Sequence, residues 1–304
     1  MAATTWALVA AAVTWAQRAL RARARERRFH ARFPLRSDGI IAGAEPRTYG
    51  GHTGHAILLL HGYNDSPASL DGVARALNEA GWTVRLPLLP GHGRSLPAHD
   101  TWTADEVLAQ ARDEYAQLRA THTTVVVGGL SMGAAVAAWI ASETDAEGLV
   151  LFAPMLFVPR HMQVAVSTAR LWVLLTKYIA GGGRRSIKDP EAGKRSIAYG
   201  CSTRRSLEAL DHIAKGITVR LGFIRVPTLV IQSEDDNRLP HDQSVHAFAR
   251  IGAKDKTIIW TKGAGHVLTV DYGWQDVAAR TVDWLSAHDR VRASLQVRAP
   301  TTDR

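Results

Sequence analysis

The pentapeptide Gly129-Leu130-Ser131-Met132-Gly133 places a serine midway between two glycines. Residues 123–127 before it are β-branched and predict a buried strand, and the alanine-rich residues 134–141 after it predict a helix. A tight strand-to-helix turn lifts a serine Oγ above the edge of a sheet, and it needs small residues on both sides because a Cβ would clash there. We therefore expect Ser131 to be a nucleophile rather than a structural serine in a turn.

A serine hydroxyl is a poor nucleophile until a base removes its proton, so a histidine must lie within reach of Ser131. Residues 256–260 predict a late strand, and Lys262-Gly263-Ala264-Gly265-His266 follows it. The glycines allow this loop to curl back across the sheet edge. The sequence therefore predicts His266 as the general base, against the alternative of a loop histidine that only hydrogen-bonds the backbone.

A carboxylate must hold the imidazole in the tautomer that accepts the serine proton and must stabilise the imidazolium that forms. The loop 233–240, after the strand predicted at 226–232, contains three acids, Glu234, Asp235 and Asp236. The loop at 154–160, after the preceding strand, contains none, which excludes an acid one strand earlier. These patterns leave the choice among the three acids open.

A tetrahedral intermediate also needs two hydrogen-bond donors for its oxyanion. The backbone N–H of Met132, the residue after the nucleophile, is one candidate. The loop His61-Gly62-Tyr63-Asn64-Asp65 follows the first core strand and offers the other, most simply the N–H of Tyr63. We expect His61 to brace this loop rather than to take part in the chemistry.

Strand and helix patterns alternate through most of the chain, which predicts an α/β fold with a mostly parallel, doubly wound sheet. Ser66 with Pro67 predicts a helix start, and Thr103-Ala104-Asp105-Glu106 predicts a capping box at the start of a helix that runs to about Arg119. Right-handed crossovers bring the carboxyl ends of the parallel strands to one edge, where sites form. The strands are expected at 56–60, 82–87, 123–127, 149–153, 226–232 and 256–260.

The alternation stops between residues 155 and 225, which predicts a helical cap inserted between two late strands. Its apolar residues could line a pocket for a lipid chain, or the helices could simply pack on one another. For Gly181-Gly182-Gly183 a mobile loop is favoured over a hinge or an anion cradle. We divide the chain into an N-terminal extension (1–36), a core (37–154 and 226–290), this cap, and a C-terminal tail (291–304). The apolar residues are Met155, Met162, Leu171, Trp172, Leu174 and Leu175.

The net charge of +9 over 304 residues is unevenly distributed. Residues 1–36 hold eight arginines and one acid, so the remaining residues carry only +2 and argue against a nucleic-acid partner. A hydrophobic content of 46% is that of a globular protein. Cys201 is the only cysteine, which excludes an internal disulfide and fits a reducing compartment. No metal-ligand spacing occurs, and neither metal nor cofactor is predicted.

Residues 1–17 carry no charged side chain, and an arginine-rich stretch follows, which reverses the order of a secretory signal peptide. One interpretation is a short membrane anchor, or a surface helix that touches anionic lipid through residues 6–28. The second is a helix lying on the protein or a frayed extension, and the weakest is a cleaved export signal. Arginines after an inserted segment stay on the cytoplasmic side. We therefore expect a cytoplasmic protein, with attachment to the cytoplasmic face of the membrane left open.

Five motifs of the chain, taken together, resemble one branch of the α/β-hydrolase superfamily, the bacterial carboxylesterases and monoacylglycerol lipases, with S33-type serine aminopeptidases nearby. The similarity covers about residues 55–288. The resemblance implies an α/β-hydrolase fold and the chain order serine, acid, histidine. The motifs that carry it are His61-Gly62, residues 89–95 (Leu-Pro-Gly-His-Gly-Arg-Ser), residues 129–133, residues 227–231 with Asp236, and Gly265-His266-Val267.

The same resemblance selects the acid. The family commonly shows a small residue three positions before its aspartate and an aliphatic-proline pair three positions after it. Ser233, Asp236 and Leu239-Pro240 match this pattern, which favours Asp236 over Asp235. Two features depart from the family: Ala134 stands where a second glycine is usual, and the segment 6–28 is an addition.

We therefore expect a serine carboxylic-ester hydrolase that acts through an acyl-enzyme on short- or medium-chain esters or monoacylglycerols. Its catalytic residues would be Ser131, Asp236 and His266, with the N–H groups of Tyr63 and Met132 as the oxyanion hole. An acyltransferase, a thioesterase or peptidase, and a C–C bond hydrolase would use the same triad, so the motifs do not separate them. A non-catalytic receptor for a small ligand on the same fold is the alternative from another class. The sequence does not indicate the oligomeric state.

Overall fold

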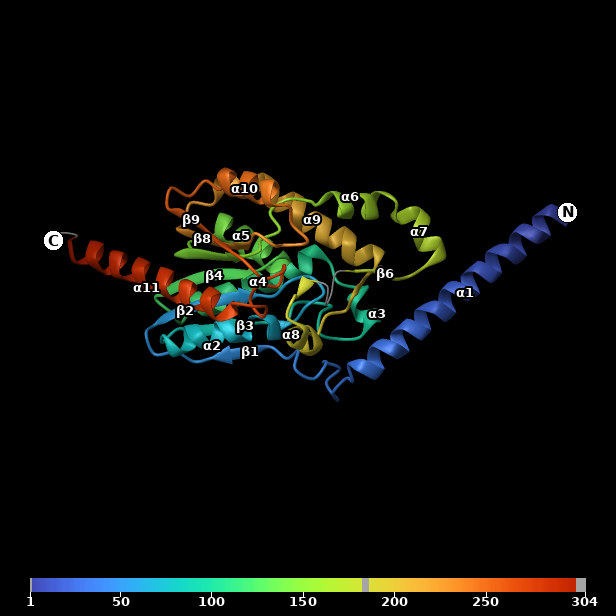
Figure 1. Cartoon of the computed structure of the whole chain (residues 1–304), viewed down its shortest axis with the longest axis horizontal. Helices are drawn as coiled ribbons and strands as arrows, with labels where there is room; N and C mark the ends of the chain where they lie inside the picture. Colours follow the sequence, from blue (N-terminus) through green and yellow to red (C-terminus); the bar gives the residue numbers. More distant parts are fainter. Residues whose placement is uncertain (1, 182–185, 299–304) are drawn as a thin grey trace.

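The computed structural model describes residues 2–181 and 186–298 and contains a mixed α/β core with a long helix projecting at the N-terminal end (Figure 1). Seven strands of these described residues form one sheet in the order β1-β3-β2-β4-β5-β8-β9, in which only β1 runs antiparallel to its neighbour. The predicted α/β class and mostly parallel sheet are confirmed. The strands are β1 (Arg47–Tyr49), β2 (His55–Leu60), β3 (Thr83–Leu86), β4 (Thr124–Leu130), β5 (Gly148–Phe152), β8 (Thr228–Ser233) and β9 (Lys256–Thr261).

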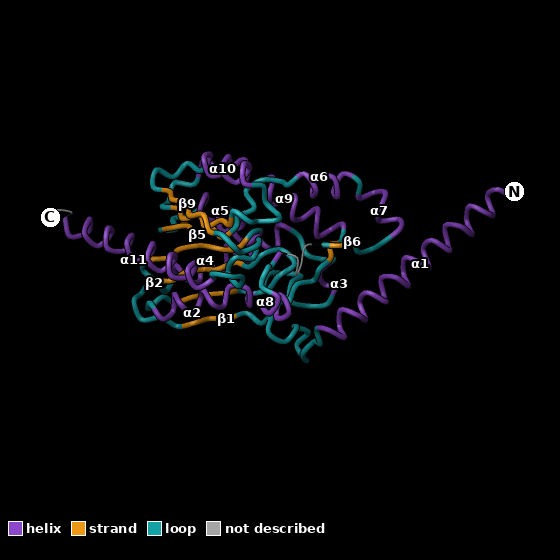
Figure 2. The backbone as a smooth tube through the Cα atoms, viewed as in Figure 1, coloured by secondary structure: helices purple, strands orange, loops and turns teal. Residues whose placement is uncertain are grey.

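The central strands read as unbroken apolar runs because both of their faces are covered. Side chains alternate along a strand, so Ile57 and Leu59 of β2 pack on one side while Leu58 and Leu60 pack on the other. The first side is covered by α2 (Asp71–Glu79) and α11 (Trp274–Arg298), and the second by α4 (Ala104–Arg119) and α5 (Met132–Glu143). Figure 2 shows the strands enclosed by helices in this way. All carboxyl ends of the parallel strands therefore meet at one edge, as expected.

The helix starts and edge strands expected from local sequence signals agree with the structure to different degrees. The capping box at Thr103 and Glu106 is present, with both reciprocal hydrogen bonds made. Ser66 and Pro67 do start a helical segment, with Ser66 as the N-cap of the 3-10 helix η1 (Pro67–Leu70), but the Ser66 side chain makes no capping hydrogen bond and α2 begins at Asp71. Strand β1 was not predicted, since three residues at a sheet edge are too short for a hydrophobic pattern.

Residues 155–225 supply short helices, a two-stranded β6–β7 ribbon and one long helix. The long helix α9 (Arg204–Arg220) packs directly on α5, and Ile213 and Ile217 are fully buried there. Gly216 allows this approach, because a Cβ would lie 2.1 Å from the Trp139 ring. The remaining elements are α6 (Arg160–Ser167), α7 (Ala169–Leu175), β6 (Ile179–Ala180), α8 (Pro190–Arg195), β7 (Cys201–Ser202), and η3 (Leu221–Phe223) after α9.

The division of the chain into four parts remains an expectation, and the structure adds detail at each boundary. Helix α11 runs without interruption past residue 290, where the tail was expected to begin. Residues 182–185, which include the last two glycines of the segment 181–183 interpreted as mobile, and residues 299–304 lie outside the described residues. The elements that complete the core are α3 (Leu96–His99) and α10 (His241–Arg250).

The N-terminal extension forms helix α1 (Ala2–Arg32), which is attached to the body of the protein at one end only. Phe29 and Phe33 are buried in a small cluster with Leu96, Tyr178 and Tyr199. The first half of α1 extends away from the core (Figure 1). No helix in the described residues is both long and apolar enough to cross a membrane.

Because α9 shares one hydrophobic core with α5, we expect Ile213→Ala to destabilise the whole molecule. A buried Ile→Ala substitution costs about 2–5 kcal/mol. The urea midpoint should fall in a single transition with an unchanged slope. Val219→Ala, at an exposed position of the same helix, is the matched control and should change stability by less than about 0.5 kcal/mol. A separate early transition in Ile213→Ala would instead show that residues 155–225 unfold on their own.

Candidate active site

Ser131 occupies the turn between β4 and α5 in a backbone conformation that non-glycine residues rarely adopt. Its φ is 55° and its ψ is −110°. The Ser131 N–H donates to Phe152 O at 2.9 Å, and the Ser131 carbonyl accepts from Ala135 N and Met155 N. Neighbouring strand β5 and the first turn of α5 therefore hold a strained residue in place, as is common at functional sites.

The two flanking glycines are required by the close approach of β2. A Cβ at Gly133 would lie 2.0 Å from Leu60 O, and one at Gly129 would lie 2.5 Å from the same atom. These distances are far below van der Waals contact, so no other residue fits without movement of the backbone. The expected steric reason for small residues on both sides of Ser131 is thus present in the structure.

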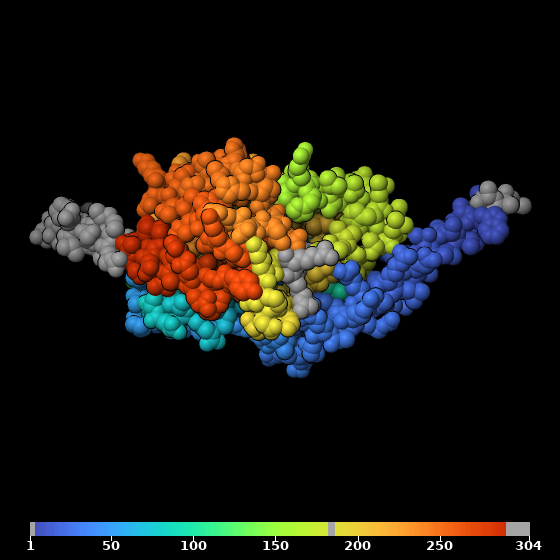
Figure 3. All heavy atoms as spheres, in the orientation of Figure 1, coloured from blue at the N-terminus to red at the C-terminus, as the bar shows by residue number. Residues whose placement is uncertain are grey.

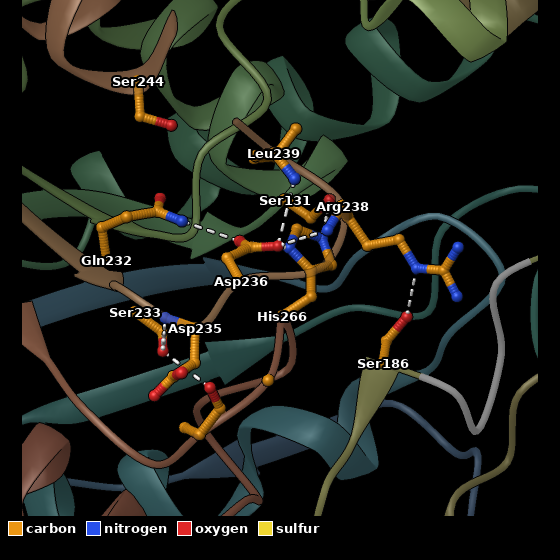
Figure 4. Close-up of polar contacts among 12 residues, drawn as sticks. Ser131, Ser186, Gln232, Ser233, Asp235, Asp236, Arg238, Leu239, Ser244 and His266 are labelled. Carbon is orange, nitrogen blue, oxygen red and sulfur yellow. Dashed lines mark hydrogen bonds and ion pairs between the residues drawn. The ribbon is translucent and has the colours of Figure 1, made fainter. Parts of the chain in front are cut away.

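The structure brings Ser131, His266 and Asp236 into one hydrogen-bonded chain (Figure 4). His266 Nε2 lies 2.8 Å from Ser131 Oγ, and His266 Nδ1 lies 2.8 Å from Asp236 Oδ2. Since a carboxylate only accepts, Nδ1 carries a proton in this arrangement and Nε2 is free to accept one from the serine. The geometry is that of a nucleophile, a base and an orienting acid.

Asp236 is buried, and its carboxylate is surrounded by donors. Its side chain is 1% exposed, and besides His266 it accepts from Gln232 Nε2 and from the backbone N–H groups of Arg238 and Leu239. Burial raises the pKa of this carboxyl, but the His266 charge, its hydrogen bond and the two N–H groups outweigh burial, so the pKa lies below its ordinary value. Asp236 is therefore ionised, as an orienting acid must be.

Asp235 is placed differently from its neighbour. Its side chain is 45% exposed, accepts from Gly263 N at 2.7 Å and pairs with Lys188 at 3.3 Å. It makes no contact with His266 among these hydrogen bonds, and it closes the loop on the outside of the site. The geometry therefore favours Asp236 over Asp235, in agreement with the family pattern.

The loop after β2 lies against the nucleophile turn. A Cβ at Gly62 would be 3.6 Å from Ser131 Cβ, so the backbone leading to Tyr63 passes next to the serine. In the described residues, neither the Tyr63 N–H nor the Met132 N–H donates to a protein acceptor. Both candidates for the oxyanion hole thus keep their donors available.

His61 braces this loop, as predicted. It accepts from Leu89 N at Nε2 (3.1 Å), so the proton is on Nδ1, which lies 2.9 Å from Gly62 O. Burial and the neighbouring His92 lower the pKa of His61 to about 3, so the ring is neutral. The side chain of Tyr63 is held separately, by a 2.7 Å hydrogen bond between its hydroxyl and Ser206 Oγ.

A cavity of about 430 Å³ opens above Ser131 and His266. Ligand pockets are typically of this size. The residues that line its apolar side come mainly from 155–225, so this segment covers the site. Of the six apolar residues considered for a lipid pocket, Met155 and Met162 line the cavity, Leu171, Leu174 and Leu175 are exposed, and Trp172 is partly buried against the hydrophobic core. Further apolar lining comes from Ala165, Ile179, Leu207, Leu210 and Leu239.

Three polar features of the cavity were not predicted. Asp65 lines it beside His266, and Arg238 lines it with its Nε bonded to Ser186 Oγ at 2.8 Å. Ser206 supports Tyr63 as part of a capping box with Thr203. The Thr-x-x-Ser spacing was a weak signal, and the positions of Asp65 and Arg238 depend on how loops fold back. In the part of the chain that the structure describes, no group of three or more histidine, cysteine or acidic residues could hold a metal ion.

Comparison with known proteins identifies a family model and several relatives that this chain matches. Residues 51–272 match the model of the family described as serine aminopeptidase, S33. The chain is 27% identical over 250 residues to a thermostable monoacylglycerol lipase of Bacillus sp. H-257, covering 82% of this chain and 97% of the relative. It is 24% identical over 218 residues to a carboxylesterase of Bacillus subtilis 168, covering 71% and 86%. A solved structure from work on the metagenome-derived lipolytic enzymes LipS and LipT matches at 24% identity with a TM-score of 0.76, covering 82% and 100%.

The geometry at Asp236 predicts an effect of Asp236→Asn on ester hydrolysis. An amide cannot hold the His266 tautomer, and such a change costs about 10⁴ in kcat in a serine triad. Asp235→Asn is the matched control and should retain activity within a few-fold. Hydrolysis of a p-nitrophenyl ester measures both variants. Loss of activity in Asp235→Asn with a functional Asp236→Asn would reverse the assignment of the acid.

Asp65 predicts a pH-dependent stability. Burial raises the pKa of its carboxyl to about 6, although hydrogen bonds from Ser69 and Ser66 and the His266 charge lower it. The folded state thus binds this proton more tightly than the unfolded state, and ionisation costs stability as the pH rises from about 4 to 6. Relative to wild type, Asp65→Asn should be more stable at pH 8 than at pH 4.5, as measured by thermal unfolding. The exposed Asp113→Asn is the control, and a difference for Asp65→Asn that does not vary with pH would contradict this explanation.

Proposed function

Because the chain belongs to the serine aminopeptidase S33 family of α/β-hydrolases, we propose that it is a serine carboxylic-ester hydrolase that acts through an acyl-enzyme. The observation that carries the proposal is the single hydrogen-bonded chain from Ser131 Oγ through His266 to the buried carboxylate of Asp236. The family model spans most of the chain, and the curated relatives include a lipase and an esterase.

In the proposed reaction, Ser131 Oγ attacks the carbonyl carbon of the ester while His266 Nε2 takes its proton. Asp236 stabilises the imidazolium and keeps the ring in position. The backbone N–H groups of Met132 and Tyr63 donate to the oxyanion. The imidazolium then protonates the departing alcohol, and a water molecule, activated by the same histidine, releases the acid from Ser131.

The cavity supports a substrate with an apolar acyl chain. Met155, Met162, Leu207 and Leu210 line one side of it, and burying a chain against such a surface gains about 0.8 kcal/mol per methylene. Polar groups of the loop at residues 64–65 also line the cavity. We propose monoacylglycerols and short- or medium-chain esters as substrates, which agrees with the activity named for the Bacillus relative at 27% identity.

We expect Ser131→Ala to reduce hydrolysis of p-nitrophenyl esters by up to about 10⁶ in kcat, because the nucleophile of the triad is removed. A series of p-nitrophenyl esters and monoacylglycerols of increasing chain length would define the acyl preference of the wild-type protein. A fluorophosphonate probe should label wild type and not Ser131→Ala. Undiminished hydrolysis by Ser131→Ala, or absence of labelling in wild type, would overturn the proposal, and the latter would favour a non-catalytic receptor.

A further inference from the structure

Helix α1 presents a row of arginines to a groove on the body of the protein. None of the proposed catalytic residues lines this groove. Arg21, Arg25, Arg28 and Arg32 are spaced by four, three and four residues, so they lie along one face of the helix. They line a groove of about 640 Å³ together with aromatic and small residues of the body of the protein. Figure 3 shows the later part of α1, in blue, against the body of the protein and the earlier part projecting beyond it.

The positive charge of this face is not cancelled locally. Glu26 is the single acid on the helix, and it accepts from the Tyr178 hydroxyl at 2.6 Å and faces Lys177 at 3.6 Å. Asp100 lies 3.9 Å from the same lysine. Both acids are thus engaged with side chains of the body, while Arg21 and Arg28 are exposed.

The first half of α1 adds an exposed apolar stripe. Trp6, Val9, Val13 and Leu20 recur at intervals of three, four and seven residues, so they share one side of the helix, and Leu8 and Trp15 are exposed on another side. Trp6 is 73% exposed and Leu20 is 63% exposed, values that are unusual for large apolar side chains. Helices that lie in a membrane interface have this composition, with tryptophan and aliphatic residues next to a row of arginines.

Helix α7 packs against α1 and extends this surface. Its Leu171, Leu174 and Leu175 are 60–70% exposed, although they belong to the segment that covers the site. The arginine groove also adjoins the catalytic cavity, because Ala180, Gly181 and Ala198 line both. The exposed apolar residues, the arginines and the cavity therefore lie at the same end of the molecule.

We propose that α1 and α7 together form a docking face for the surface of an anionic lipid bilayer. Arg25 and Arg32 donate to Gly200 O and Ser196 O of the body, so the exposed Arg21 and Arg28 meet acidic headgroups, while the tryptophan and the leucines enter the interface. Because no described helix is apolar enough to span a bilayer, the helix lies on the surface. This inference goes beyond the proposed ester hydrolysis and does not depend on it, since binding requires no catalytic residue.

The test is co-sedimentation of the full chain with vesicles of phosphatidylcholine alone and of phosphatidylcholine mixed with phosphatidylglycerol. Each basic residue near an anionic surface strengthens partitioning by about fivefold. The double variant Arg21→Glu, Arg28→Glu should therefore bind the mixed vesicles at least about 25-fold more weakly than wild type. High salt should weaken wild-type binding as well, since the Debye length falls to about 3 Å at 1 M.

The matched control carries the same change of net charge elsewhere. Arg225 and Lys254 are exposed and do not line the groove. Arg225→Glu with Lys254→Glu should bind mixed vesicles within a few-fold of wild type. Leu171→Ser with Leu174→Ser should weaken binding and leave hydrolysis of a soluble p-nitrophenyl ester unchanged.

Three outcomes would overturn the proposal: no binding of wild type to mixed vesicles, equal binding to phosphatidylcholine alone, or equal losses in the arginine variant and its control. Ser131→Ala should bind vesicles as wild type does. If an inactive Ser131→Ala variant still binds vesicles, membrane docking is independent of the proposed ester hydrolysis. If the wild-type protein hydrolyses esters but does not bind vesicles, the docking proposal is wrong and the proposed function stands.

Discussion

The close contact between the end of β2 and the start of α5 is the constraint on which the site depends. Leu60 O occupies the space that a side chain at residue 133 or 129 would need. Because the two backbones touch, the position of Ser131 is fixed relative to the loop that leaves β2. That loop carries Tyr63, and α5 begins with Met132, so one contact sets the distance between the nucleophile and both candidate oxyanion donors. This contact goes with a strained backbone conformation at Ser131, and hydrogen bonds from β5 and α5 hold that conformation in place.

The protein uses buried imidazoles in two distinct ways. His61 and His92 contact one another as rings and face backbone groups, and burial keeps both neutral, with pKa values of about 3 and 4. Their hydrogen bonds to backbone groups hold the loops around the site in place. His266 differs because it faces an ionised carboxylate on one side and a hydroxyl on the other. Only the second environment can stabilise an imidazolium, which is what proton transfer requires.

The parts of the structure that could be predicted from sequence are those with a local pattern. Buried strands appear as apolar runs, the turn at Ser131 needs its glycines, and the capping box at Thr103 has a recognisable spacing. The choice of Asp236 over Asp235 required family resemblance, because adjacent carboxylates differ only in what surrounds them after folding. The short edge strand β1 had no pattern to detect. The position of Asp65 beside His266 and the burial of Phe29 and Phe33 of α1 depend on contacts between distant segments, which periodicity does not report. The leucines of α7 were apolar enough to suggest a pocket, but a seven-residue helix leaves its outer face uncovered.

The first turns of helix α9 line the cavity and its later turns pack on α5, and this arrangement bears on how the protein can change. Leu207 and Leu210 line the cavity, while Ile213 and Ile217, one and two turns further on, are anchored on α5. The part of α9 that lines the cavity is therefore continuous with a part that is packed in the hydrophobic core. Substitutions at 207 and 210 can widen or shorten the cavity, and with it the space for the proposed acyl chain, while Ile213 and Ile217 keep the helix on α5. Leu207 and Leu210 are buried in the same core cluster as Ile213 and Ile217, so a change of cavity shape at these positions also alters the core, and substitutions that conserve side-chain volume vary the cavity at the lowest cost in folding stability.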